Sequence, residues 1–164
     1  MLLDHLRSAS RRDSQWDTLI DPFFTADANT GIHIAVLVEP YLRFILDGTK
    51  TVESRFSRNG CAPYKRVTTG HLVLLKKPAG PIVGACFVSD VWFYRLTPAV
   101  LQEIRQRFGP AIQPQYGFWE ARANAAFATL MRLVDVQVLP SVHIPKRDRR
   151  GWVVLRNQAS AALS

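Results

Sequence analysis

The sequence predicts an α+β domain built on a closed or nearly closed mixed β-barrel with short flanking helices. Short apolar, β-branched runs are numerous along the chain, and helical patterns are few. A doubly wound α/β protein would need a helix after almost every strand, and the sequence lacks that alternation. The length of 164 residues fits one domain with a core of its own.

The first half of the chain is expected to run strand, helix, strand and loop. Residues 32–38, IHIAVLV, are apolar and too short for a helix, so they predict a buried strand. Pro40 is typical of a first helical position, and Gly48 is the expected end of that helix. KTVESRF, residues 50–56, alternates with a period of two and predicts the next strand, which leads into a polar loop over 57–70.

The second half adds two helical segments among longer strands. Thr97 and Pro98 predict an N-cap and first turn of a helix, and a second helical segment is expected from about Gly117. The remaining strands are predicted at 71–77, 82–96, 127–139 and 151–155. We expect an N-terminal arm over 1–30, the domain over 31–157 and a disordered tail over 158–164.

The charge is positive and unevenly distributed. The chain has 21 basic and 13 acidic residues, a net charge of +8, and residues 1–30 hold five of the acids but only three of the basics, which leaves +10 for the rest. No acidic residue occurs between Ser54 and Ser89. A positive field of this kind attracts polyanions, although it also serves solubility alone.

Several classes of protein find no support in the sequence. Cys61 and Cys86 form no CxxC pair and the histidines are scattered, so no metal site is expected. No P-loop or GxSxG motif is present, and no cofactor is expected. No apolar run reaches the length of a membrane helix, so we expect a soluble, cytoplasmic protein without a membrane partner.

The stretch GTKTVESRF, residues 48–56, concentrates charges at the start of a strand. In an extended chain Thr51, Glu53 and Arg55 point to one face, and Lys50 lies where the backbone is not yet regular, so it can turn to either side. One interpretation is a surface strand with ion pairs worth under about 1 kcal/mol. The other is the mouth of a cleft.

A resemblance to a known family favours the cleft. Gly48, Lys50, Glu53 and Arg55 reproduce the Gly-x-Lys-x-x-Glu-x-Arg signature of the ASCH domain family, a branch of the PUA-like superfamily. The likeness extends from about His33 to Leu155, because HLVLLKKPAGPIVGACFVSDVWFY and the closing KRDRRGWVVL also resemble family segments. It implies a PUA-like pseudo-barrel with a cleft for RNA, other nucleic acid or a modified nucleoside.

In that resemblance Lys50 and Arg55 contact phosphate or a base edge, and Glu53 accepts hydrogen bonds from a base or orients Arg55. Some relatives are amidohydrolases that deacylate an acylated cytidine, and others are ribonucleases. A hydrolase would use Lys50 and Glu53 as general acid and base or as electrostatic stabilisers. Glu53 stands where the amidohydrolases have a threonine nucleophile, and Thr51 is displaced by two residues, which counts against deacylation.

The candidate binding residues combine the motif, the basic loop, an aromatic pair and a final basic run: Gly48, Lys50, Thr51, Glu53, Arg55, Arg58, Tyr64, Lys65, Arg66, Tyr116, Trp119, Lys146, Arg147, Arg149 and Arg150. Tyr116 and Trp119 either stack on bases or belong to the core. Three functions remain open at this point: an RNA-binding or nucleoside-binding module, a small hydrolase acting through the same cleft, and a basic dock for an acidic protein.

Overall fold

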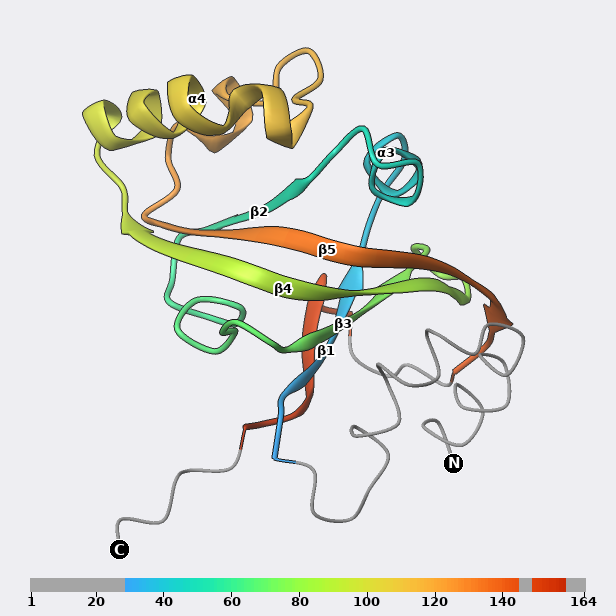
Figure 1. Cartoon of the computed structure of the whole chain (residues 1–164). Helices are drawn as coiled ribbons and strands as arrows, with labels where there is room; N and C mark the ends of the chain where they lie inside the picture. Colours follow the sequence, from blue (N-terminus) through green and yellow to red (C-terminus); the bar gives the residue numbers. More distant parts are fainter. Residues whose placement is uncertain (1–28, 145–148, 159–164) are drawn as a thin grey trace, which may run out of the picture.

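The computed structural model describes residues 29–144 and 149–158, and within them six strands form one curled mixed sheet (Figure 1). The strands are β1 (Ile32–Val36), β2 (Val52–Ser57), β3 (Leu72–Lys76), β4 (Ile82–Arg95), β5 (Phe127–Val142) and β6 (Trp152–Arg156). The helices within the described residues are α3 (Tyr41–Leu46) and α4 (Pro98–Ile112), and a 3-10 turn, η2, spans Glu120–Arg122. The spatial order of the strands is β2-β5-β4-β3-β1-β6.

Two long antiparallel strands give the sheet its curl. β4 and β5 span 14 and 16 residues, and their pairing shifts register three times, between Ile82 and Gly84, Ala85 and Phe87, and Val88 and Asp90. Irregularities of this kind bend a strand and increase its twist. The curled sheet brings β2, at one edge, toward β1 and β6 at the other.

The connection from β1 to β3 determines where the candidate motif lies in the fold. β1 pairs with β3 in parallel, so the chain leaves the sheet after β1, forms α3, adds β2 at the far edge and returns to β3 beside β1. Gly48 follows α3 with a φ of 84°, a left-handed conformation that favours glycine. The motif therefore begins at a helix end and continues into an edge strand.

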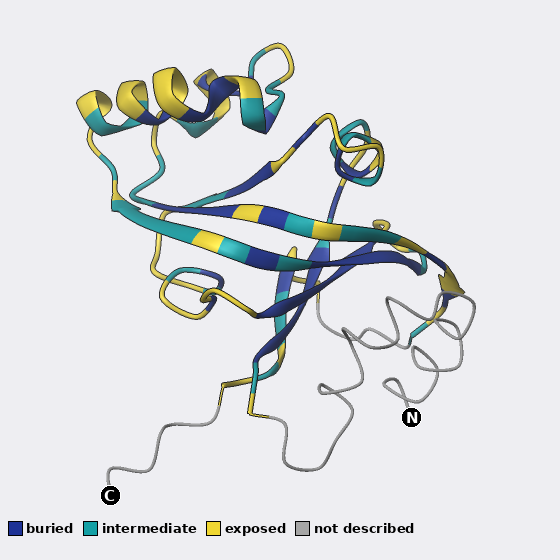
Figure 2. Cartoon of the chain, in the orientation of Figure 1, coloured by how far each residue is buried: buried dark blue, intermediate teal, exposed yellow. Residues whose placement is uncertain are grey.

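The core occupies both faces of the sheet (Figure 2). Inside the curl, Leu75, Cys86, Met131 and Trp152 belong to one buried cluster. On the other face α4 buries Ile104, Phe108 and Ile112 together with Val52 and Leu130. α4 starts as predicted, because the Thr97 side chain accepts a hydrogen bond from the Val100 N–H at 3.2 Å.

The helix predicted from Gly117 is wrong. Gly117 has a φ of 78°, and the residues after it form turns and the short η2 in place of an α-helix. The physical reason is the nearby strand: β5 starts at Phe127, and the Ala126 N–H already donates to the Ser57 carbonyl at 2.8 Å. Too few residues separate Gly117 from that pairing for a longer helix.

The prediction of an α+β domain on a nearly closed mixed barrel is confirmed. Residues 1–28 of the predicted N-terminal arm, residues 159–164 of the predicted tail over 158–164, and the candidate residues Lys146 and Arg147 lie outside the described residues. Among the helices that the structure describes, none has the length and apolar character needed to cross a bilayer.

Candidate functional site

A cleft of about 480 Å³ runs along the free edge of β2. One wall comes from the end of β1 and the start of α3, and the opposite wall comes from the 118–122 turn. Its lining residues are Val36, Leu37, Val38, Tyr41, Lys50, Glu53, Ser54, Arg55, Phe56, Phe118, Ala121 and Arg122. The volume falls in the usual range for sites that take a small organic group.

Backbone hydrogen bonds define which groups of β2 face this cleft. The carbonyls of Thr51 and Ser57 accept from Leu133 and Ala126, so odd-numbered residues direct their backbone groups toward β5. In an antiparallel pair the N–H and C=O of one residue point the same way, and neighbouring residues point oppositely. The backbone groups of Val52, Ser54 and Phe56 therefore face the free edge.

Lys50 is buried beside the start of β2, with 2 % of its surface exposed. Its Nζ donates to the Val52 carbonyl at 2.7 Å and to the Ile112 carbonyl, at the end of α4, at 2.9 Å. Burial lowers the pKa of Lys50, and the nearby Glu53 carboxylate partly offsets this effect. Two of the three ammonium protons thus bind carbonyl groups of the fold.

Glu53 is also buried, with 6 % exposure, and its two carboxylate oxygens differ. Oε1 accepts from the Ser54 N–H at 2.9 Å and lies 3.4 Å from Arg55 Nε. Oε2 accepts no hydrogen bond from the described residues, although it has almost no exposed surface. A buried carboxylate oxygen without a donor costs free energy, on the order of 1–3 kcal/mol, which a donor group entering the cleft would offset.

Arg55 connects three strands. Nη2 donates to the Val36 carbonyl at 2.9 Å, and Nη1 donates to the Gly151 carbonyl, just before β6, at 3.1 Å. The guanidinium carbon lies 5.3 Å from the centre of the Trp152 ring. Both terminal nitrogens therefore bind backbone carbonyls across the mouth of the curled sheet, a role that the sequence did not reveal.

Arg122 forms the opposite wall of the cleft. Its guanidinium carbon lies 3.5 Å from the centre of the Phe118 ring, and its Nη1 donates to the Phe118 carbonyl at 2.8 Å. The side chain is half-buried, and burial lowers the pKa of the guanidinium, which still remains protonated. A partly dehydrated cation in this position favours an anionic ligand.

Sequence reasoning missed Arg122, Phe118, Tyr41 and Phe56 as cleft residues. For Arg122 and Phe118 the sequence does hold a signal, the interval of four residues between them, since residues four apart lie side by side in a turn of helix. Of the predicted residues, Lys50, Glu53 and Arg55 line the cleft together. Gly48 and Thr51 are exposed and outside its lining, with Thr51 preceding the regular strand.

The predicted loop and aromatic residues lie elsewhere. Arg58, Tyr64, Lys65 and Arg66 belong to the loop after β2 and are absent from the cleft lining. Trp119 packs in the core against Phe56 and Phe118, at ring distances of 6.4 and 4.9 Å, and Tyr116 is fully exposed on the 114–117 loop. Arg149 and Arg150 are exposed next to Gly151, whose carbonyl binds Arg55.

In the part of the chain that the structure describes, no three His, Cys, Asp or Glu side chains gather in a way that could hold a metal ion. The charged lining of the cleft comprises three cations, Lys50, Arg55 and Arg122, and one carboxylate, Glu53. The side chains that line the cleft therefore carry more positive than negative charge.

The α+β fold, one curled mixed sheet with two helices, is the fold of ASCH proteins of known structure. The chain is similar to the crystal structure of ASCH from Zymomonas mobilis, with a TM-score of 0.57, 16% identity and coverage of 76% of this chain and 87% of that one. A point mutant of the Zymomonas protein gives 0.59, 14% identity and coverage of 79% and 92%. A protein from Enterococcus faecalis gives 0.52, 10% identity and coverage of 80% and 95%.

These likenesses concern structure. No protein-family model matches the sequence, and no curated protein matches it. At identities of 10 to 16% the comparison establishes the fold and nothing finer. The ASCH-like fold predicted from the signature is confirmed, and the function rests on the site itself.

Proposed function

We propose that the protein is a binding module for single-stranded RNA that takes one unstacked nucleotide into the cleft along β2. The observation that carries the proposal is the lining of the cleft: three cations, one carboxylate oxygen without a donor, and aromatic rings around a space of about 480 Å³. Proteins read RNA sequence mainly on unpaired bases, which are accessible to such pockets.

Each polar group of the cleft has a role in this proposal. Glu53 accepts a hydrogen bond at Oε2 from an exocyclic amino group after a small rotation of its side chain exposes that oxygen, a contact that favours cytosine over uracil. Arg122, held flat on Phe118, binds the phosphate or stacks on the base. Lys50 and Arg55 contribute positive potential while their hydrogen bonds hold the walls of the cleft in place.

Arg122→Gln and Glu53→Gln test the proposal without removing the hydrogen bonds that Lys50 and Arg55 make to the fold. Arg122→Gln should weaken binding of a labelled ten-nucleotide single-stranded RNA about tenfold or more, measured by fluorescence anisotropy. Glu53→Gln retains an acceptor for the Ser54 N–H but replaces the other oxygen by a donor, so it should reduce the preference for oligocytidine over oligouridine.

Arg105→Gln is the matched control, because Arg105 is exposed on α4 and outside the cleft lining. It should change affinity less than twofold. Wild-type affinity should also fall with rising salt, as expected when phosphate contacts release counterions. Equal affinities of the Arg105→Gln and Arg122→Gln variants would refute the cleft as the binding site.

The same titration distinguishes other ligands and a hydrolase. Equal affinity for a single-stranded DNA oligonucleotide of the same length would widen the proposal to single strands in general. Binding of a free modified nucleoside, with no binding of RNA, would replace the proposal. Gel analysis of the bound RNA shows whether it is cut. Lys50, the residue a hydrolase would need, already donates two of its protons to backbone carbonyls, so no specific observation favours catalysis.

A further inference from the structure

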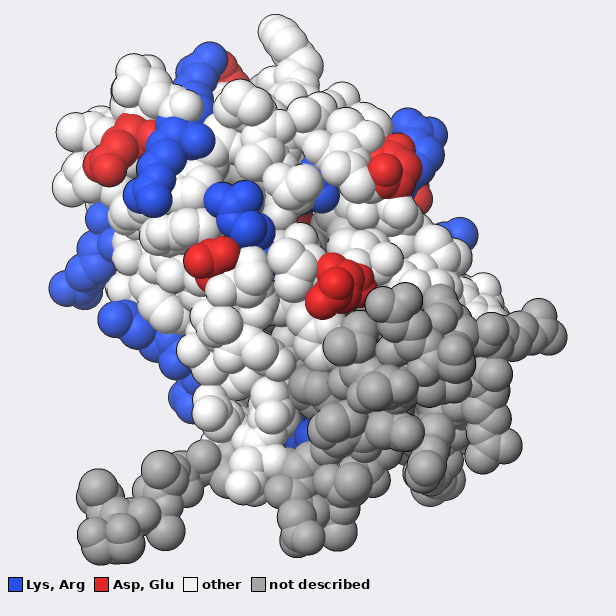
Figure 3. Space-filling view, in the orientation of Figure 1, with Lys and Arg blue, Asp and Glu red and all other residues white. Residues whose placement is uncertain are grey.

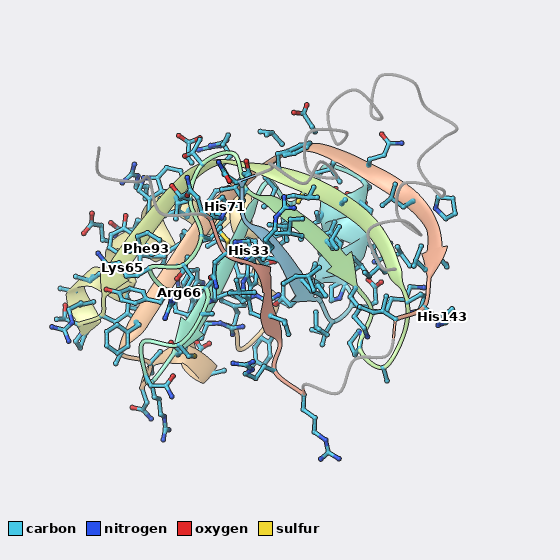
Figure 4. The ribbon with its side chains drawn as sticks, turned by 90° about the horizontal axis from the view of Figure 1, so that it is seen from below. His33, Lys65, Arg66, His71, Phe93 and His143 are labelled. Carbon is cyan, nitrogen blue, oxygen red and sulfur yellow. The ribbon has the colours of Figure 1, made fainter. Side chains whose placement is uncertain are left out.

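Two exposed cations lie over aromatic rings at the end of the sheet where β4 ends and β5 begins. The Arg95 guanidinium carbon is 5.4 Å from the centre of the Phe127 ring, and Lys65 Nζ is 5.4 Å from that of Phe93. The Tyr64 ring contacts the rings of both Phe93 and Phe127, at 5.5 and 4.8 Å. We name these five residues, Tyr64, Lys65, Phe93, Arg95 and Phe127, the basic platform. Figure 4 shows Lys65 beside Phe93, with Arg66 nearby.

The strand register places the basic platform on the same face of the sheet as the motif charges. Arg55 pairs with Thr129, which pairs with Phe93; one row further along, Ser57 pairs with Phe127, which pairs with Arg95. Residues two apart in a strand point to the same face. Arg55 and Phe93 thus belong to one row, and Arg95 and Phe127 belong to the next.

The platform starts where the cleft ends. Arg55 lines the cleft, and Ser57, two residues further along the same face of β2, lies in the outer row beside Phe127. Because neighbouring strands are spaced about 4.8 Å apart, the Arg95 backbone lies about 10 Å from that of Ser57. A short length of single-stranded polynucleotide spans this separation.

The loop beside the basic platform carries only positive charges, and the two cations of the platform form no ion pairs among the described residues. The loop over 57–70 contains no acidic residue, and it adds the exposed Arg58 and Arg66. Among the described residues, neither Lys65 nor Arg95 forms an ion pair. Figure 3 shows lysine and arginine atoms along the side of the molecule where β4 ends, continuing from α4 toward the loop after β2. Phosphate groups are the complementary partner for cations displayed in this way.

We propose that a single-stranded RNA with one base in the cleft continues across the basic platform, where Lys65 and Arg95 bind the following phosphates. The ligand is then an oligonucleotide and not a free nucleoside. This inference rests on the proposed function and specifies its substrate class. The aromatic rings hold both cations in position, so that little side-chain entropy is lost on binding.

The test compares a Lys65→Gln, Arg95→Gln double variant with a control double variant, Arg43→Gln, Lys77→Gln. The control removes the same charge from exposed positions on α3 and after β3. The probes are a ten-nucleotide single-stranded RNA, followed by anisotropy, and cytidine monophosphate, followed by NMR titration. The platform variant should bind the RNA about tenfold or more weakly, with a salt slope lower by about 1.4 for two lost phosphate contacts.

In the same comparison, cytidine monophosphate should bind wild type and the platform variant within twofold of each other, and the control variant should bind RNA as wild type does. Unchanged RNA affinity of the platform variant, with Arg122→Gln still weakening binding, would overturn this inference and leave the proposed function in place. An equal loss in the control variant would also overturn it, because only bulk charge would then matter. If wild type bound no RNA at all, the proposed function itself would fall and this inference with it.

Discussion

Arg55 Nη2 and the Val36 carbonyl oxygen lie 2.9 Å apart and join the edge strand β2 to the end of β1. A second bond of the same guanidinium, to the Gly151 carbonyl at 3.1 Å, reaches the chain just before β6. The sheet order places β2 and β6 at opposite edges. One side chain therefore bridges the opening of the pseudo-barrel.

Arg55→Ala should lower the free energy of unfolding by about 1–3 kcal/mol, because it removes a part-buried hydrogen bond to the Val36 carbonyl and an exposed one to the Gly151 carbonyl, both from a charged donor. Urea denaturation followed by tryptophan fluorescence measures this loss. Arg58→Ala, at an exposed position three residues on, should stay within about 0.5 kcal/mol of wild type. Equal stability of the two variants would contradict the bridging role.

Lys50→Met should also destabilise the fold, by about 1–3 kcal/mol, although it places an apolar side chain in a buried position. The cause is the loss of the donor for the carbonyls of Val52 and Ile112, which then lack one partner inside the protein. Lys77→Met, on the exposed turn after β3, is the control. A Lys50→Met protein as stable as wild type would mean that the ammonium serves a ligand only.

Gly84→Ala should separate α3 from the sheet. A Cβ at this position would lie 2.7 Å from Leu46 Cδ2 and 3.0 Å from the Gln137 carbonyl oxygen, too close for an ordinary contact. We expect a loss of about 1–3 kcal/mol in unfolding free energy and weaker RNA binding, since Lys50 follows α3. Gly60→Ala, whose Cβ would meet only Tyr64 at 3.7 Å, should leave both unchanged. Normal stability of Gly84→Ala would contradict the close packing.

Stability should fall as the pH falls from about 6.5 to about 4, because of a buried histidine pair. Trp152 Nε1 donates to His33 Nδ1 at 3.1 Å, so His33 uses its other nitrogen, Nε2, as the donor to His71 Nδ1, 2.8 Å away. Figure 4 shows the two rings side by side. Burial, with a smaller effect of the His71 charge, lowers the pKa of His33 to about 4. Both rings are neutral in this arrangement.

The loss of stability at lower pH follows from proton binding to His33. Between pH 6.5 and 4 the unfolded chain protonates His33 and the folded chain does not, so the unfolded state gains protons and is favoured as the pH falls. The loss should reach about 2–4 kcal/mol near pH 4. Urea titrations of wild type and His33→Gln at pH 7, 5.5 and 4.5 measure it, and the difference between the two proteins should shrink toward low pH. A difference independent of pH would show that folding does not lower the pKa of His33.

Local pattern predicted most of the secondary structure, and tertiary contact decided the rest. The structure contains three elements that local sequence signals predicted: the N-cap of α4, the long strand from Phe127 and the edge strand from Val52. The helix predicted from Gly117 failed because pairing with β2 starts within ten residues. The local sequence after Gly117 does not show that a helix there competes with strand pairing to β2.

The candidate site was predicted by its motif, but the partners of the motif were not. Alternation placed Glu53 and Arg55 on one face, as the register confirms. Apart from the Val52 carbonyl, the acceptors of Lys50 and Arg55 lie at the end of α4, at the end of β1 and just before β6, which are 19 to 96 residues away. Only the folded chain brings them together, and the same is true of Arg122, which reaches the cleft from the turn after Gly117.

Two hydrogen bonds along β2 also reduce the tendency of the protein to self-associate. The Val52 carbonyl is occupied by Lys50 and the Ser54 N–H by Glu53, both on the side of β2 that no other strand covers. An exposed strand with free backbone groups is a template on which a second molecule can add a strand and begin a fibril. Two of the four charged side chains that line the cleft, Lys50 and Glu53, fill those positions, so a variant that loses both should self-associate as well as lose its ligand.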